Sequence, residues 1–153
     1  MHVIEDAYEL LSYGDGAWLL SCEHASPHYP RGFAPDARDA HLDGTHWTYD
    51  LGAAELCREL AEASSATAVL SRFSRLLIDP NRALDDATLF RLEAEGRDIA
   101  LNAALEDAER ARRTTKLYEV YHRALGDAVN ESEAQLVFSV HTFTPTYEGA
   151  DRP

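Results

Sequence analysis

One short run decides the fold class of this 153-residue chain: WLLSC at residues 18–22, which is followed by Glu23 and His24. An apolar run without polar alternation is typical of a strand that is buried on both faces, as in a parallel sheet. Similar runs predict a second strand at residues 66–70 (ATAVL) and a last one at residues 135–140 (QLVFSV). Strands of this kind need helices on both sides of the sheet to cover them.

The segments between these strands carry a helical pattern. Residues 46–63 and 102–129 place apolar side chains at spacings of three and four, with charged residues around them. A short helix is also expected within residues 85–96. Since strands alternate with helices, we expect βαβ units with right-handed crossovers. The predicted fold is a single α/β domain over residues 1–153, with a mainly parallel or mixed sheet and helices on both faces.

Three other segments are less regular. Residues 26–44 contain three prolines and two glycines, so they should be mostly loop. The stretch LLID at residues 76–79 predicts a short extended segment that Pro80 stops. Residues 1–16 give no functional signal, and we expect them to form a short helix that packs on the domain.

The composition excludes several classes of protein. The chain has 27 acidic and 14 basic residues, and its net charge of −13 repels nucleic acid and anionic lipid. Its apolar runs are far shorter than the roughly 20 residues that cross a bilayer, and its N-terminus lacks a signal-peptide pattern. We therefore expect a cytoplasmic protein without nucleic-acid or membrane partners. An anionic substrate would need a local arginine clamp.

The two cysteines, Cys22 and Cys57, are predicted to be buried thiols and not a disulfide framework. A nucleophilic Cys22 assisted by His24 is the weaker interpretation, because residues two apart on an extended segment need not meet.

Polar residues follow two of the predicted strands at their carboxyl ends. Glu23 and His24 follow the first strand, and His141 follows the last. Ligands of open parallel sheets bind at this edge, where a crevice leaves room for a metal ion and water. His24 and His141 are therefore candidate metal ligands, against the alternative that each is a separate surface or packing residue.

Spacing alone leaves the third ligand open. His46 and Asp50 are four residues apart at a predicted helix start and share one face. Asp50 there also has a structural explanation, because the helix dipole favours a carboxylate near the N-terminus. Glu23 joins the site only if the strand ends before it, and His28 lies in a loop of unknown path.

Residues 74–82, SRLLIDPNR, are the other concentration of polar groups. Arginine presents a planar fork that binds a carboxylate through two parallel hydrogen bonds, and asparagine adds an amide donor. Arg75, Asn81 and Arg82 are therefore candidate substrate-binding residues. An equally good explanation is a structural pair of Asp79 with an arginine at the turn near Pro80.

Four motifs in order resemble those of the N-formylglutamate amidohydrolase family: SCEHAS at 21–26, HWTYDLGA at 46–53, SRLLIDPNR at 74–82 and SVHTFTPTYEGADRP at 139–153. The similarity runs from about residue 17 to the end. The resemblance implies a phosphorylase/hydrolase-like α/β fold related to zinc carboxypeptidases and aspartoacylase-like deacylases. It also implies zinc-dependent hydrolysis of an N-formyl or other N-acyl amino acid, which releases a small acid and an amino acid such as glutamate.

The resemblance further implies the metal site. His24 and His141 become zinc ligands, and Asp50 of the HWTYD motif becomes the third. The zinc carboxypeptidases use His-x-x-Glu for their first two ligands, whereas Pro27 stands three residues after His24, so the assignment of Asp50 is an inference.

By the same resemblance, Asn81 and Arg82 hold the substrate carboxylate, with Arg75 as a second clamp. Glu23, or a carboxylate outside this chain, accepts the proton of the attacking water and passes it to the leaving amine. Glu148 and Arg152 either line the same crevice or are ordinary solvated loop charges.

Family members usually continue beyond the motif that ends at Arg152 and Pro153, so we expect a fragment or a reduced form. The alternative function is a non-catalytic or fragmentary member that binds metal or an acidic metabolite without turnover. A truncated sheet would have an uncovered edge, which favours instability or a homo-oligomer.

Overall fold

The structure is a computed structural model that describes residues 1–147 and 150–151. Its elements are, in chain order, β1 (His2–Ile4), β2 (Tyr8–Ser12), β3 (Trp18–Cys22), η1 (Ala37–Leu42), α1 (Ala53–Ala63), β4 (Thr67–Ser71), β5 (Glu93–Ala94), β6 (Arg97–Asp98), α2 (Ala100–Ala103), α3 (Asp107–Arg113), η2 (Thr114–Tyr118), α4 (Glu119–Glu131), β7 (Leu136–Ser139), β8 (Thr146–Tyr147) and β9 (Ala150–Asp151).

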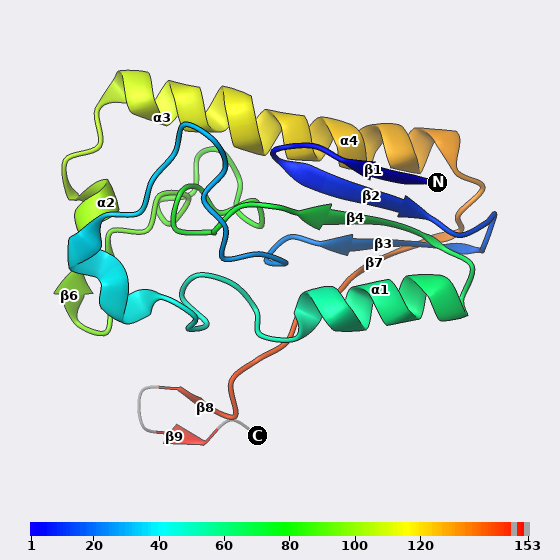
Figure 1. The fold of residues 1–153 in the computed structure, drawn as a ribbon, viewed down its shortest axis with the longest axis horizontal. Coiled ribbons are helices and arrows are strands. Elements are labelled where there is room, and N and C mark those ends of the chain that lie inside the picture. The colour runs from blue at the N-terminus through cyan, green and yellow to red at the C-terminus, as the bar shows by residue number, and fades with distance from the viewer. Residues whose placement is uncertain (148–149, 152–153) are drawn as a thin grey trace.

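The main sheet is mixed, with five strands in the order β1-β2-β4-β3-β7 (Figure 1). β3 runs parallel to both of its neighbours, so that Leu20 pairs with Ala68 of β4 and with Phe138 of β7. β2 pairs antiparallel with β4 and with β1. β5 pairs with β6, and β8 with β9, in two-stranded sheets. The predicted α/β class with a mainly parallel or mixed sheet is confirmed.

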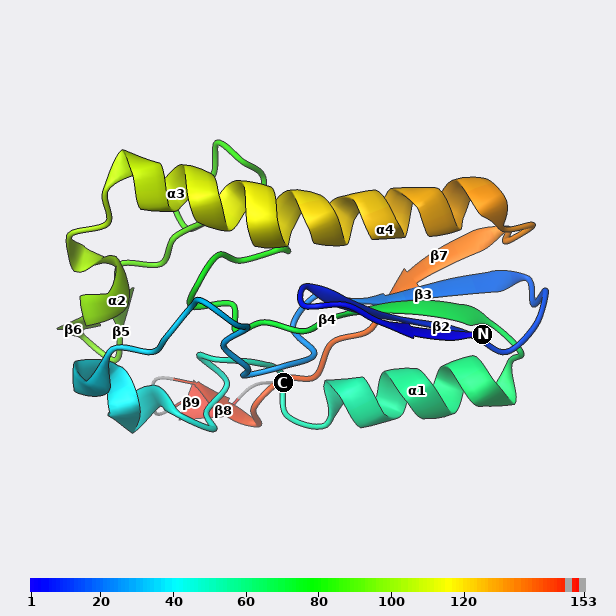
Figure 2. The same ribbon diagram turned by 45° about the horizontal axis from the view of Figure 1, so that its top comes forward.

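Helices cover both faces of this sheet, as predicted (Figure 2). α1 lies on one face, where Leu20 packs with Cys57. The helical stretch of α3, η2 and α4 lies on the other, where Leu19 packs with Leu117 and Tyr121. Successive side chains of a strand point to opposite faces, so both leucines of β3 are fully buried. This two-sided burial explains why the run at residues 18–22 shows no polar alternation.

The strands predicted at residues 18–22, 66–70 and 135–140 correspond to β3, β4 and β7, and Cys22 and Cys57 are both fully buried. β7 forms an edge of the sheet. Its residues Leu136, Val137 and Phe138 expose 48%, 50% and 48% of their surface, so this edge is uncovered in the described part of the chain. The oligomeric state stays a prediction.

The predictions of a helix in residues 1–16 and of an extended segment at residues 76–79 are wrong. Residues 1–16 form β1 and β2 instead of a helix, because alternate side chains of Tyr8–Ser12 are buried and the strand pairs along its length with β4. Residues 76–79 form turns and not a strand. Their backbone amides bond to separate partners, for example Leu77 to Ser74 and Asp79 to Leu89, and these residues pair with no strand among those that the structure describes.

The predicted helices differ mainly at their starts. The helix expected from residue 46 begins at Ala53, because residues 46–52 form turns that end at Gly52 in the left-handed region (φ 79°). The short helix expected within residues 85–96 is replaced by turns and the β5–β6 hairpin. The long helix expected from residue 102 starts at Asp107, after a break that leaves α2 separate. Residues 26–44 are mostly loop, as predicted, with η1 inside it.

In the described residues, no helix is long and apolar enough to cross a membrane.

A buried polar hub joins the helices to the loops beside the sheet. The Nδ2 atom of Asn102 donates to the carbonyl oxygens of Leu76 (2.9 Å) and Arg91 (2.8 Å). Its Oδ1 accepts a hydrogen bond of 2.8 Å from Arg113, whose guanidinium also donates to the carbonyl of Leu77. Because this buried amide satisfies two carbonyl groups and a guanidinium N–H, it links residues 76 and 91 to Arg113 of α3.

The variant Asn102→Ala should lower the free energy of unfolding by about 2–4 kcal/mol, because it leaves buried carbonyls and a guanidinium N–H without partners. Chemical denaturation measures this change. The matched control is Asn130→Ala, at an exposed position of α4, which should change stability by no more than about 0.5 kcal/mol. Equal effects of the two substitutions would contradict the role of the hub.

Candidate active site

The site forms where the carboxyl ends of β3 and β7 meet the turn before α1. His24 and His141 each follow their strand by two residues, and Asp50 lies in the turn that precedes Gly52. Since β3 and β7 are parallel neighbours, the two imidazoles come to the same edge, with ring centroids 5.1 Å apart. The backbone amide of Asp50 donates to the carbonyl of His24 (2.9 Å), which ties the turn to the strand end.

These three side chains could hold a metal ion. One ligand atom from each of His24, Asp50 and His141 lies within 4.8 Å of the other two. Oδ2 of Asp50 is 3.5 Å from Nδ1 of His24 and 2.7 Å from Nδ1 of His141. Zinc with bonds of roughly 2.0–2.1 Å holds tetrahedral ligand atoms about 3.4 Å apart, so the first distance suits it and the second must widen. Two imidazole nitrogens and a carboxylate are donors that zinc accepts in hydrolytic sites.

Carboxylates hold the outer nitrogens of both imidazoles. Nε2 of His24 hydrogen-bonds Oδ1 of Asp79 at 2.7 Å, and both side chains are buried. Nε2 of His141 lies 3.0 Å from Oγ of Ser139 and 3.3 Å from Oε2 of Glu23. A carboxylate on the outer nitrogen fixes the tautomer and the ring orientation, and it leaves Nδ1 for a metal. The donor set and its support therefore fit a zinc ion.

Asp79 is the site residue whose role the sequence did not reveal. Its position in the DPNR motif suggested a partner for an arginine, and Arg75 does pair with it (Nη2 to Oδ2, 2.7 Å). The contact with His24, however, spans 55 residues, and no local pattern predicts it. Arg75 also approaches Asp50 (Nη1 to Oδ1, 3.6 Å), so one guanidinium lies between two carboxylates of the site.

Both aspartates are held in the charged form. Burial alone would raise the pKa of Asp50, but hydrogen bonds to His141 and His24 outweigh it and lower this pKa below its usual range. Burial would also raise the pKa of Asp79, and there His24 and Arg75 lower it. The edge of the sheet therefore carries buried negative charge that a cation would balance.

Glu23 lies behind His141 and is not among the residues that line the pocket. Oγ of Ser139 donates to its Oε2 at 2.6 Å. Burial would raise the pKa of Glu23, but hydrogen bonds from His141, Ser139 and Ser21 lower it to about 2. In return, Asp50 and Glu23 raise the pKa of His141 to about 9. The proton transfer expected of Glu23 stays a prediction, and its position favours support of His141.

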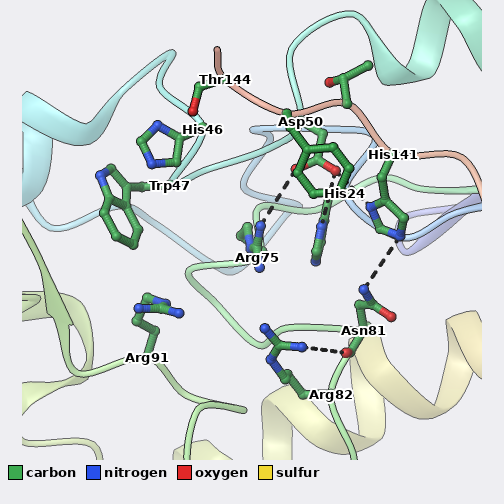
Figure 3. Close-up of a pocket in the computed structure, with 12 residues that line it drawn as sticks. His24, His46, Trp47, Asp50, Arg75, Asn81, Arg82, Arg91, His141 and Thr144 are labelled. Atoms are coloured by element: carbon green, nitrogen blue, oxygen red, sulfur yellow. Dashed lines mark hydrogen bonds and ion pairs between the residues drawn. The ribbon is translucent and has the colours of Figure 1, made fainter. Parts of the chain in front are cut away.

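A cavity of about 340 Å³ opens beside the candidate metal ligands (Figure 3). Twelve residues line it: His24, His46, Trp47, Asp50, Arg75, Asn81, Arg82, Arg91, His141, Thr142, Phe143 and Thr144. Three of them are arginines and one is an aspartate, so the wall is locally basic in a chain of net charge −13. The structure thus brings together the predicted ligands His24, Asp50 and His141 with the predicted substrate contacts Arg75, Asn81 and Arg82.

The remaining candidate residues that the structure describes lie outside the cluster of possible metal ligands. His46, an open candidate for the third ligand, lines the cavity beside Trp47 (ring centroids 4.7 Å apart) and is outside the metal-ligand cluster. His28 does not line the cavity. Arg91 was missed, because it lies in a segment that was predicted to be helical and carries no motif. The predictions for Glu148 and Arg152 fall outside the described residues.

Side chains from the helical stretch fix the backbone of the DPNR segment. The hydroxyl of Tyr118 donates to the carbonyl oxygen of Arg82 (2.8 Å), and Nε2 of His122 donates to that of Pro80 (3.0 Å). Tyr118 ends η2, a π-helical segment within the stretch. Segments of this kind add a residue to a helical turn and often occur at functional sites. Asn81 and Arg82 are thereby held at the cavity wall.

Comparison with known proteins identifies a family and similar solved structures. A model of the N-formylglutamate amidohydrolase family matches residues 16–153. The crystal structure of a gene product from Agrobacterium tumefaciens is 33% identical, with a TM-score of 0.85 over 97% of this chain and 61% of that one. The N-formylglutamate amidohydrolase from Ralstonia eutropha JMP134 is 28% identical, with a TM-score of 0.54 over 82% of this chain and 51% of that one. The chain thus spans less than two thirds of either relative's length. No curated protein matches it.

In the metal-free chain, the pKa of His141 should lie near 9 instead of 6.5, because Asp50 and Glu23 favour the charged imidazole. The folded-state pKa exceeds the unfolded one. The stability that this charge adds is therefore fully present below pH 6.5 and is lost as pH rises through 9. An NMR titration of the imidazole measures the pKa, and Asp50→Asn should bring it back toward 6.5. A wild-type pKa at or below 6.5 would contradict the geometry.

Proposed function

Because the chain belongs to the N-formylglutamate amidohydrolase family, we propose that it hydrolyses the amide bond of an N-formyl or other N-acyl amino acid. The products would be a small acid, formate for an N-formyl substrate, and an amino acid such as glutamate. One observation carries the proposal: His24, Asp50 and His141 converge at a basic cavity, and carboxylates hold the outer nitrogens of both imidazoles.

Zinc is the metal that we propose for this site. Nδ1 of His24, Nδ1 of His141 and Oδ2 of Asp50 would hold it, since these atoms face one another. A zinc ion supplies a Lewis acid that polarises a carbonyl and activates water at neutral pH. Asp79 and Glu23 keep the two imidazoles in the ligating orientation.

Substrate binding falls to the DPNR segment. Asn81 and Arg82 would hold the substrate carboxylate, since an amide and a guanidinium offer several parallel donors. Tyr118 and His122 keep the backbone of this segment in place, so that the scissile bond is oriented toward the metal ligands. Arg75 lines the same cavity, but its pairing with Asp79 and its approach to Asp50 favour a supporting role, and its contact with substrate stays a prediction.

We assign Glu23 a positioning role in place of the proton transfer that the resemblance implies. Its carboxylate accepts a hydrogen bond from Ser139 and lies beside Nε2 of His141, on the side away from Asp50. A group in this position can align His141, but it reaches the cavity only through that ring.

A second candidate function is binding of a metal or an acidic metabolite without turnover. The observation that favours it is the lining of the cavity, in which Asp50 is the only carboxylate among the described residues. Asp50 is already a proposed ligand, so a separate carboxylate to accept a proton is missing from this described wall. Hydrolysis by the purified chain distinguishes the two functions.

The purified chain should bind about one zinc per molecule and release formate from N-formyl-L-glutamate. His24→Ala and His141→Ala should each lose the zinc and the hydrolysis, because each removes one of three ligands. Elemental analysis and a formate assay measure the two properties. His41→Ala, at an exposed position of η1, is the matched control and should keep both.

The outcomes separate the candidates. Zinc binding without formate release supports the non-catalytic function. A folded wild-type chain that takes up no zinc when it is supplied overturns both metal-based functions.

Glu23→Gln should weaken zinc binding by about tenfold, because a neutral amide supports His141 less well than a carboxylate does. The turnover number at saturating zinc should change by less than about threefold, since the proton transfer does not pass through Glu23 in this proposal. Competition with a chromophoric chelator measures the affinity. Unchanged zinc affinity together with a hundredfold fall in turnover would restore the proton-transfer role.

A further inference from the structure

Arg91 lines the cavity but has no part in the function proposed above. Its backbone is fixed by the buried amide of Asn102, which donates to the carbonyl oxygen of Arg91 at 2.8 Å. Its guanidinium lies over the ring of Trp47, with Cζ 5.1 Å from the ring centroid. Trp47 is itself 9% exposed and donates from Nε1 to Oε1 of Glu95 at 3.3 Å. Both the backbone and the guanidinium of Arg91 are therefore held in place.

The ion pairs among the cavity residues leave the guanidinium of Arg91 available to bind an anionic group of a ligand. Arg75 is paired with Asp79 and approaches Asp50. Arg82 and Arg91 form no ion pair with any residue that the structure describes; Arg82 donates to a backbone carbonyl, and Arg91 stacks on Trp47. A half-buried guanidinium stays charged at any ordinary pH and prefers a carboxylate as its partner. The cavity therefore offers two cations without carboxylate partners.

Arg82 and Arg91 lie at different places in the cavity, so they can contact different carboxylates of one bound ligand. Nδ2 of Asn81 lies 3.5 Å from Nε2 of His141, so the end of the cavity with Asn81 and Arg82 adjoins the proposed metal ligands. In the view of Figure 3, Arg91 lies beside Trp47, across the cavity from His141, and Arg82 lies between Arg91 and Asn81. The carboxylate next to the scissile amide would meet Arg82, and a carboxylate farther along the substrate would meet Arg91.

We propose that Arg91, held on Trp47, is the specificity-determining residue that binds the side-chain carboxylate of the substrate. The pocket then selects N-acyl derivatives of dicarboxylic amino acids over those with neutral side chains. A neutral amide of the same shape would leave the guanidinium without a charged partner, and its binding is weaker for that reason. This assignment rests on the proposed function for the identity of the ligand, but it concerns binding and is tested without turnover.

The test compares L-glutamate, the amino-acid product, with L-glutamine, which has the same shape and a neutral side chain. Isothermal titration of the zinc-supplied chain should show glutamate binding at least about tenfold more tightly than glutamine. Arg91→Gln should weaken glutamate binding by about tenfold or more while glutamine changes by less than about twofold. Arg91→Lys should keep part of the preference. Arg97→Gln, an exposed arginine of the adjacent hairpin, should keep all of it.

These binding measurements test the role of Arg91 independently of whether the chain hydrolyses a substrate. An equal loss of affinity for both amino acids in Arg91→Gln would overturn it, because Arg91 would then only shape the cavity. No preference for glutamate in the wild type would overturn it as well. A preference that Arg91→Gln abolishes supports it even if the chain releases no formate, and that absence of hydrolysis counts against the proposed function alone. Unfolding midpoints close to the wild-type value exclude misfolding of the variants.

Discussion

The parallel pairing of β3 with β7 is the constraint on which the site depends. Ser21 pairs with Ser139, and the amide of Val140 donates to the carbonyl of Ser21 at 2.8 Å, so the ladder continues to the end of both strands. This pairing brings His24 and His141 to the same edge of the sheet, with ring centroids 5.1 Å apart, although more than a hundred residues separate them in the sequence. A slip of one residue would turn every side chain of a strand to the other face.

Around these imidazoles the protein keeps three buried carboxylates. Glu23, Asp50 and Asp79 are each less than a tenth exposed, and removing a carboxylate from water is costly unless hydrogen bonds and cations compensate. Two imidazoles and Arg75 provide the compensation in the metal-free chain. A bound metal would add positive charge beside Asp50, which lies between the Nδ1 atoms of the two imidazoles.

The charge of the cavity wall opposes that of the molecule as a whole. An anionic substrate is repelled by a chain of net charge −13, but salt screens this repulsion beyond roughly 8 Å at physiological ionic strength. At contact distance the guanidinium groups of Arg82 and Arg91 dominate instead. Their positions are set by groups outside the cavity: Tyr118 holds the backbone of Arg82, and Asn102 that of Arg91. The helices above the sheet and α2 therefore position these two arginines of the cavity wall.

The sequence alone located β3, β4 and β7 as apolar runs, and it was right about the burial of β3 and β4 but not of β7, which lies exposed at the edge of the sheet. It also located the residues that follow the strand ends, and four motifs identified the family, whose resemblance implies Asp50 as the third ligand. Four features became visible only in the folded chain: the pairing of Asp79 with His24, the position of Glu23 behind His141, the place of Arg91 and the strands of residues 1–16. Local periodicity reports which face of an element is buried. It carries no information on which distant segment lies against that face, and each of these features is a contact between distant segments.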